Sequence, residues 1–114
     1  KNKYCFESYC FLHGDKDFDE IYDKKIKYWI MGHLHPAIKL REGNKTEGYK
    51  CFLFGKYKGK KIMLVPSFSE INEGIDVREL KKKMIWNFNF GGFKVYVVSD
   101  DLKVVNFGEL RKIK

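Results

Sequence analysis

Residues 27–36 have the sequence KYWIMGHLHP, in which the run Lys27–Met31 stops abruptly at Gly32-His33. A short, largely apolar run that ends in polar loop residues predicts a buried strand. Residues 9–14, YCFLHG, have the same pattern, because Tyr9–Leu12 is followed directly by His13-Gly14. The sequence therefore predicts two buried strands, each of which leads into a loop that contains histidine.

The segment between these strands predicts one short helix. Phe18, Ile21 and Tyr22 lie at helical spacing in an acidic stretch, and Asp17 or Asp19 is available as an N-cap. A strand, helix, strand order favours parallel pairing, and α/β sheets bind ligands beyond the carboxyl ends of such strands. We therefore expect the two strands to be adjacent and parallel, with His13 brought near His33.

The second half of the chain predicts two hairpins and little helix. Residues 66–77 are irregular, and 78–85 predict a single exposed helix that carries three consecutive lysines, 81–83. Each hairpin consists of two β-rich runs with a turn between them: 49–57 and 61–65 around Lys58-Gly59-Lys60, and 94–98 and 104–107 around Ser99-Asp100-Asp101. The expected fold class is α/β (α+β), with a mixed sheet and C-terminal hairpins.

The composition describes one globular domain, residues 1–114. Hydrophobic residues make up 44% and charged residues 33% of the 114, and no stretch approaches the roughly 18 apolar residues of a membrane span. The chain opens at Lys1 on a strand-like run, and we expect an N-terminal portion to be missing. The net charge is +8, and residues 24–114 hold twenty Lys or Arg against nine acids. Such a basic surface attracts phosphates, nucleic acids and acidic partners.

Three cysteines, Cys5, Cys10 and Cys51, form no C-x-x-C pair and are odd in number. This pattern predicts neither a disulfide framework nor a zinc site. It favours a reducing cytoplasmic compartment.

All three histidines follow predicted strands, which is the distribution expected of metal ligands. His33 and His35 form an i, i+2 pair directly after Gly32, and a loop leaving a strand can aim two neutral imidazoles at neighbouring coordination positions. Asp15 is placed to accept an imidazole N–H and fix its tautomer, or equally to cap the following helix.

Gly32-His33-Leu34-His35 resembles the final metal-binding motif of the calcineurin-like metallophosphoesterases. Leu12-His13-Gly14-Asp15 resembles the motif that precedes it. The segments 35–37, 49–53, 65–68 and 74–77 are similar to the archaeal branch of this superfamily that is related to the nuclease SbcD. The resemblance extends from about residue 9 to residue 110.

The resemblance implies a β-sandwich flanked by helices, with two divalent metal ions at the strand ends. His13 and His33 would bind one metal and His35 the other. Manganese is the metal that the resemblance favours, with iron, zinc, nickel or magnesium as alternatives. A metal-activated hydroxide would hydrolyse a phosphomonoester or phosphodiester, the substrate being a nucleotide or nucleic acid in the nuclease-related members.

The three family motifs that supply the carboxylates, an Asn ligand and the catalytic histidine are absent from the sequence. Three neutral imidazoles lack the charge that would hold two dications together about 3.5 to 4 Å apart. The chain therefore resembles the C-terminal half of the enzyme. By itself it is expected to be incomplete and inactive, and to need the missing N-terminal portion of the same domain as its partner.

Other motifs are weaker. Residues 15–26 depart from a calcium loop at Glu20 and Ile26, and residues 55–61 lack the spacing of a phosphate loop and predict a solvated turn. Residues 92–97 resemble the aromatic strand of an RNA-recognition module, although alternating core packing explains them better. The alternative function is a noncatalytic, basic, β-rich module that binds nucleic acid. It would use Lys56, Lys58, Lys60 and Lys61 with nearby aromatic residues.

Overall fold

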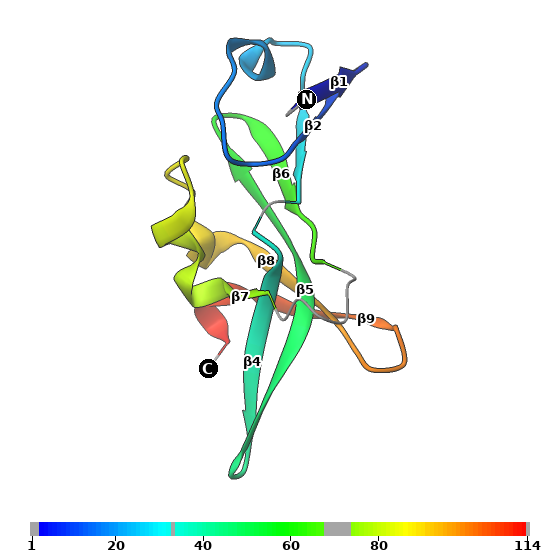
Figure 1. Ribbon diagram of the computed structural model, residues 1–114, viewed down its shortest axis with the longest axis vertical. Coiled ribbons are helices and arrows are strands. Elements are labelled where there is room, and N and C mark those ends of the chain that lie inside the picture. Colours follow the sequence, from blue (N-terminus) through cyan, green and yellow to red (C-terminus); the bar gives the residue numbers. More distant parts are fainter. Residues whose placement is uncertain (1–2, 33, 68–73, 114) are drawn as a thin grey trace.

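A computed structural model describes residues 3–32, 34–67 and 74–113, which form a small mixed α+β domain dominated by one mixed sheet (Figure 1). The strand order is β1-β2-β3-β6-β5-β4-β7, with β8 paired to β5 and β9 to β8. The strands are β1 (Lys3–Phe6), β2 (Tyr9–Leu12), β3 (Tyr28–Met31), β4 (Pro36–Glu42), β5 (Lys45–Tyr57), β6 (Lys60–Leu64), β7 (Ile75–Asp76), β8 (Lys94–Val98) and β9 (Val104–Glu109). The helices within the described residues are all short 3-10 helices: η1 (Asp19–Tyr22), η2 (Val77–Lys83), η3 (Phe90–Gly92) and η4 (Leu110–Lys112).

The predicted parallel pairing of the first two buried strands is confirmed. β2 and β3 pair in parallel from Tyr9 opposite Tyr28 to Leu12 opposite Met31. β3 pairs in parallel with β6 as well, and Met31 lies opposite Leu64. Three neighbouring strands therefore run in the same direction and end at the same edge of the sheet.

Both predicted hairpins are confirmed, and β5 and β9 are longer than the sequence indicates. β5 and β6 are antiparallel, and the turn between them is Lys58-Gly59, with φ of 49° and 79°. Positive φ at both central residues is the geometry that matches the twist of a tight hairpin. β8 and β9 are also antiparallel, with a bulge where the pairing shifts between Val95 and Tyr96. Strand β5 runs along much of the molecule and joins the two ends of the sheet (Figure 1).

The helical predictions hold only in part, because both segments are 3-10 helices. The N-cap residue of η1 is Phe18, so neither Asp17 nor Asp19 is its N-cap. Instead, the Asp17 carboxylate accepts hydrogen bonds from the Phe18 N–H and the Tyr22 hydroxyl. η2 is not fully exposed, since Val77 and Leu80 are buried. One or two buried residues per segment give too little apolar contact to support a longer helix.

The core lies on one face of the sheet and is rich in aromatic residues. Trp29 is fully buried, and its indole N–H donates to the Ile21 carbonyl at 2.9 Å. Phe93 packs across Gly55 so closely that a Cβ at that glycine would lie 2.2 Å from the ring. Gly55 thus leaves the space that Phe93 occupies. Residues 92–97, which resemble the aromatic strand of an RNA-recognition module, follow the alternating core packing that the sequence favours, because Phe93, Val95 and Val97 are buried.

The opposite face of the sheet is apolar and exposed. Tyr9 stacks on Tyr28 with ring centroids 4.6 Å apart, and a groove of about 660 Å³ runs past Ile30 and Met63. The large exposed aromatic side chains on this face are Tyr4, Phe6, Tyr9, Phe11 and Phe54, which are 38% to 62% exposed. Parallel strands are normally covered on both faces. This face is therefore a surface suited to a further layer.

The prediction that the cysteines form no disulfide is wrong. Cys5 and Cys10 lie directly opposite each other in the β1–β2 hairpin and are disulfide-bonded. The two-residue turn at Glu7-Ser8, with Glu7 at φ 54°, brings them into register. Because the disulfide is present, the cysteine pattern no longer supports a reducing compartment. Within the described residues, no helix is long and apolar enough to cross a membrane.

We predict that the thiol of the third cysteine, Cys51, does not react with thiol reagents in the folded chain. Burial raises the pKa of the Cys51 thiol to about 12, and the negative charge of Asp76 adds to the rise. The thiol should therefore stay protonated at about pH 8.5, where an ordinary thiol is half ionised. Titration with Ellman's reagent should find no fast thiol in the native oxidised chain, one after unfolding, and three after unfolding and reduction. Three thiols in the unfolded chain without reductant would contradict the disulfide.

Candidate metal centre

The ends of β2 and β3 place two predicted metal-binding loops at one edge of the sheet. Because Leu12 lies opposite Met31, the next residues, His13 and Gly32, leave their strands at equivalent positions. The Val65 N–H donates to the Met31 carbonyl at 2.8 Å, so β6 ends beside them. The parallel pairing thus produces the juxtaposition of loops on which a site at strand ends depends.

His13 is exposed on this edge, and Gly14 behind it is buried with φ 110°. Only glycine adopts that φ readily, so the chain can turn sharply just after the histidine. Asp15 is exposed and lies four residues before η1, whose N-cap is Phe18. The helix-capping alternative for Asp15 is therefore wrong, and its role as an acceptor for an imidazole stays a prediction.

The two remaining histidines differ in what the structure says of them. His33 lies outside the described residues, so its expected proximity to His13 stays a prediction. His35 is partly buried with φ 51°, and its Nδ1 atom is buried without a hydrogen-bond partner among the described residues. A buried polar atom without a partner is costly in a folded protein. An imidazole with a buried, unpartnered nitrogen is suited to binding a ligand.

The described residues do not form a complete group of metal ligands. Across 3–32, 34–67 and 74–113, no three His, Cys, Asp or Glu side chains are close enough together to hold a metal ion. A coordination shell built from His13 and His35 alone is therefore partial.

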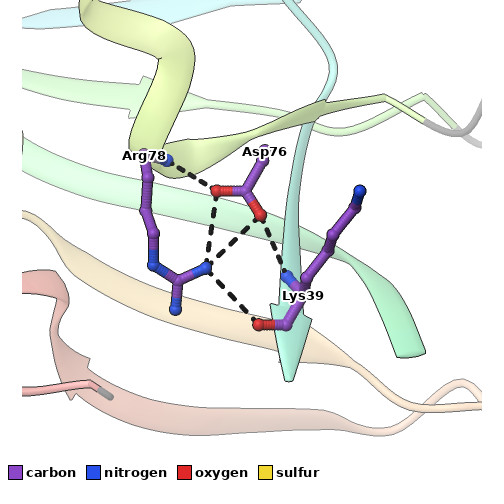
Figure 2. A network of polar contacts seen from close by, with 3 residues as sticks. All are labelled: Lys39, Asp76 and Arg78. Atoms are coloured by element: carbon purple, nitrogen blue, oxygen red, sulfur yellow. Dashed lines mark hydrogen bonds and ion pairs between the residues drawn. The ribbon is translucent and has the colours of Figure 1, made fainter. Parts of the chain in front are cut away.

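A polar network beside His35 was missed by the sequence reasoning. Figure 2 shows the Asp76 carboxylate between Lys39 and Arg78: it accepts from the Lys39 N–H at 3.3 Å and from the Arg78 N–H at 2.9 Å. The Arg78 guanidinium lies 3.3 Å from the same carboxylate and 3.4 Å from the Lys39 carbonyl. In the sequence, Asp76 stands out only as part of the segment 74–77 that resembles the family. Its partner Lys39 lies 37 residues earlier, and such a distance leaves no local signal.

The lysines of the β5–β6 turn do not form one solvated group. Lys60 is only 8% exposed, and its ammonium donates to the carbonyls of Asp23 and Ile26 at 2.7 Å and 2.6 Å. Its predicted place in a solvated turn and in a nucleic-acid surface is therefore wrong. Lys58 lies over the rings of Tyr22 and Tyr57, and Lys61 over that of Tyr28.

Comparison of the chain with protein-family models, curated proteins and solved structures finds no match.

We predict that Lys60→Met lowers the free energy of unfolding by about 2–3 kcal/mol. The buried carbonyl of Ile26 and the partly buried carbonyl of Asp23 lose a charged donor, and a hydrogen bond to a charged group contributes about 1.5–3 kcal/mol net. Lys56→Met, at an exposed position of the same hairpin, is the matched control and should change stability by less than about 0.5 kcal/mol. Urea denaturation measures both, and equal effects would show that the Lys60 contacts do not stabilise the fold.

Proposed function

We propose that the chain is the histidine-bearing half of a metal-dependent phosphoesterase with a calcineurin-like fold. The observation that carries the proposal is the in-register parallel pairing of β2 and β3, which aligns the starts of the two histidine loops. In this proposal His13 and His33 hold one divalent ion and His35 holds the other. Phosphomonoesters and phosphodiesters are both substrates that such a centre can take.

The residues of this chain fit one part of a metal centre. Neutral imidazole is a good ligand for several divalent ions, and the unpartnered, buried Nδ1 of His35 supports a role in binding. When bound, the metal ions supply Lewis acidity toward the phosphoryl oxygens. The loops after β2 and β3 position the imidazoles, and Asp15 is proposed to orient one of them. The carboxylate ligands must come from the remainder of the domain.

The exposed sheet face supports the presence of such a remainder. Tyr28 and Ile30 alternate with the buried Trp29 and Met31 along β3, so the strand is apolar on both faces. A strand of this kind is typical of a sheet with a layer on each side. We propose that the missing portion of the domain packs on this face and contributes the carboxylates.

The groove on that face also favours a second candidate function, binding of single-stranded nucleic acid. Phe54 offers an exposed ring, and Lys56, Lys61 and Lys94 border the groove, which no described carboxylate lines. Stacking platforms flanked by lysines are the usual surface for single strands. The two functions differ in what they require of the exposed sheet face. The phosphoesterase proposal needs it covered by protein, and nucleic-acid binding needs it open to solvent.

The phosphoesterase proposal predicts that, in the complete domain, His33→Ala and His35→Ala each lower kcat by about 100-fold or more. A lost ligand opens a coordination position on an ion that stabilises the transition state. Lys81→Ala, Lys82→Ala and Lys83→Ala are the controls, because these exposed side chains of η2 act only through a long-range field. Turnover of a chromogenic phosphodiester and bound manganese are measured together. Wild-type turnover in His33→Ala with stoichiometric metal would reject the proposal.

The nucleic-acid candidate predicts that a fluorescent oligothymidylate binds the 114-residue chain and is released steeply between low and physiological salt. Phe54→Ala should weaken binding by about tenfold, because a stacking platform is lost. Tyr4→Ala is the control, since Tyr4 is exposed but does not line the groove. Anisotropy at two salt concentrations measures the effect, and equal affinities of the two variants would count against the groove.

A further inference from the structure

The backbone of His35 has a conformation that its own sequence disfavours. Its φ is 51°, in the left-handed region, and it precedes Pro36. A residue before proline is normally extended, because the proline ring crowds its N–H and Cβ. Such a conformation persists only where the surrounding structure imposes it. The contacts around His35 therefore identify what holds it.

Gly74 lies against the carbonyl of His35. Its φ is 85°, and a Cβ built on it would lie 2.4 Å from the His35 carbonyl oxygen and 3.2 Å from the Cβ of Ala37. A larger residue at this position would push the His35 carbonyl away. The next residue continues the contact, because the Ile75 N–H donates to that same carbonyl at 3.0 Å.

Asp76 links the segment that contacts His35 to strand β4 of the sheet. β7 has only two residues, and its parallel pairing sets Pro36 opposite Ile75 and Ala37 opposite Asp76. The Asp76 carboxylate bonds the Lys39 and Arg78 N–H groups, and the Arg78 guanidinium closes the network onto the Lys39 carbonyl (Figure 2). Buried Val77 and Leu80 anchor η2 behind it. So short a strand depends on this network for its position.

We propose that residues 74–78 are a positioning element for His35, in which Gly74 and Asp76 hold its left-handed backbone and so direct its imidazole toward a divalent metal ion. The proposal rests on the proposed function, because it takes His35 to be a ligand. It adds two positioning residues from a segment that contains no ligand. The buried Nδ1 of His35, which has no hydrogen-bond partner among the described residues, is the independent sign that the imidazole is directed for binding.

The test compares Gly74→Ala with Gly108→Ala in the 114-residue chain. Gly108 lies in β9 with φ 80°, and a Cβ there would meet no atom within 4 Å, so it matches Gly74 in backbone conformation without the close approach to a neighbour. Two NMR readouts are recorded: the HN–Hα Overhauser effect within His35, which is strong in a left-handed residue, and broadening of each imidazole by Mn²⁺ alone. Broadening by Mn²⁺ detects even weakly held ligands.

In Gly74→Ala we expect a weaker Overhauser effect at His35, and about tenfold more Mn²⁺ for the same broadening of its imidazole. His13 should respond as in the wild type, and Gly108→Ala should leave both readouts unchanged. Unchanged broadening of His35 in Gly74→Ala, whatever its backbone does, would overturn the proposal. Broadening of neither histidine in the wild-type chain would instead reject the metal site itself, and the positioning role with it.

Asp76→Asn serves if Gly74→Ala does not fold. It keeps the size of the side chain and removes the charge that pairs with Arg78. We expect the same two changes at His35, smaller than those of Gly74→Ala. The control is Glu79→Gln, which removes a carboxylate that pairs with Lys82 on the exposed side of η2. Equal behaviour of Asp76→Asn and Glu79→Gln would also overturn the proposal.

Discussion

The burial of Trp29 is the constraint on which the arrangement of the sheet depends. Its ring contacts those of Tyr22, Tyr57 and Trp86, with centroids 5.3 Å to 5.9 Å away, and its N–H is bonded to the Ile21 carbonyl. Side chains alternate across a strand, so a slip of one residue would move Trp29 to the exposed face and leave its N–H without that partner. The register of β3 against β2 and β6 is therefore strongly specified. That register decides where the chain leaves the sheet, at His13 and Gly32.

The chain continues beyond that edge into β4 without reversing its direction. β3 is parallel to β6, and β6 and β4 are both antiparallel to β5, so β4 runs in the same direction as β3. His35, the residue before Pro36, has its left-handed φ at the point where the chain enters β4. The backbone cost of a left-handed residue is of the order of 1–3 kcal/mol. The pairing of β4 with β7 and the hydrogen bond from the Ile75 N–H to the His35 carbonyl help to offset that cost.

Local sequence patterns predict the strands and hairpins of this chain but not its long-range contacts. The apolar runs before His13 and His33 and the turn at Lys58-Gly59 carry their own signals, and all three elements form as expected. The disulfide carries no such local signal, because the register of Cys5 with Cys10 depends on a turn at Glu7-Ser8 that lacks a glycine or asparagine. Lys60 looks solvated in a lysine-rich turn, yet its partners lie 37 and 34 residues earlier. Of the candidate site, the sequence predicts the histidines that are proposed as ligands, whereas the contact of residues 74–76 with His35 emerges only from the fold.

The chemistry of the exposed sheet face bears on which of the two candidate functions is the better one. Ile30 and Met63 lie opposite each other at its middle, and Phe11 is the neighbour of Ile30 on the next strand. Aliphatic side chains cannot stack a base or bind a phosphate, and covering them requires apolar partners such as the inner side of a protein layer. Lys56 and Lys61 pair with each other toward the end of the strands away from His13, and Lys94 lies opposite Phe54. These lysines can meet carboxylates at the margin of such a layer. The aliphatic centre of the face thus favours a protein covering. In the phosphoesterase proposal, the same layer would carry the carboxylate ligands.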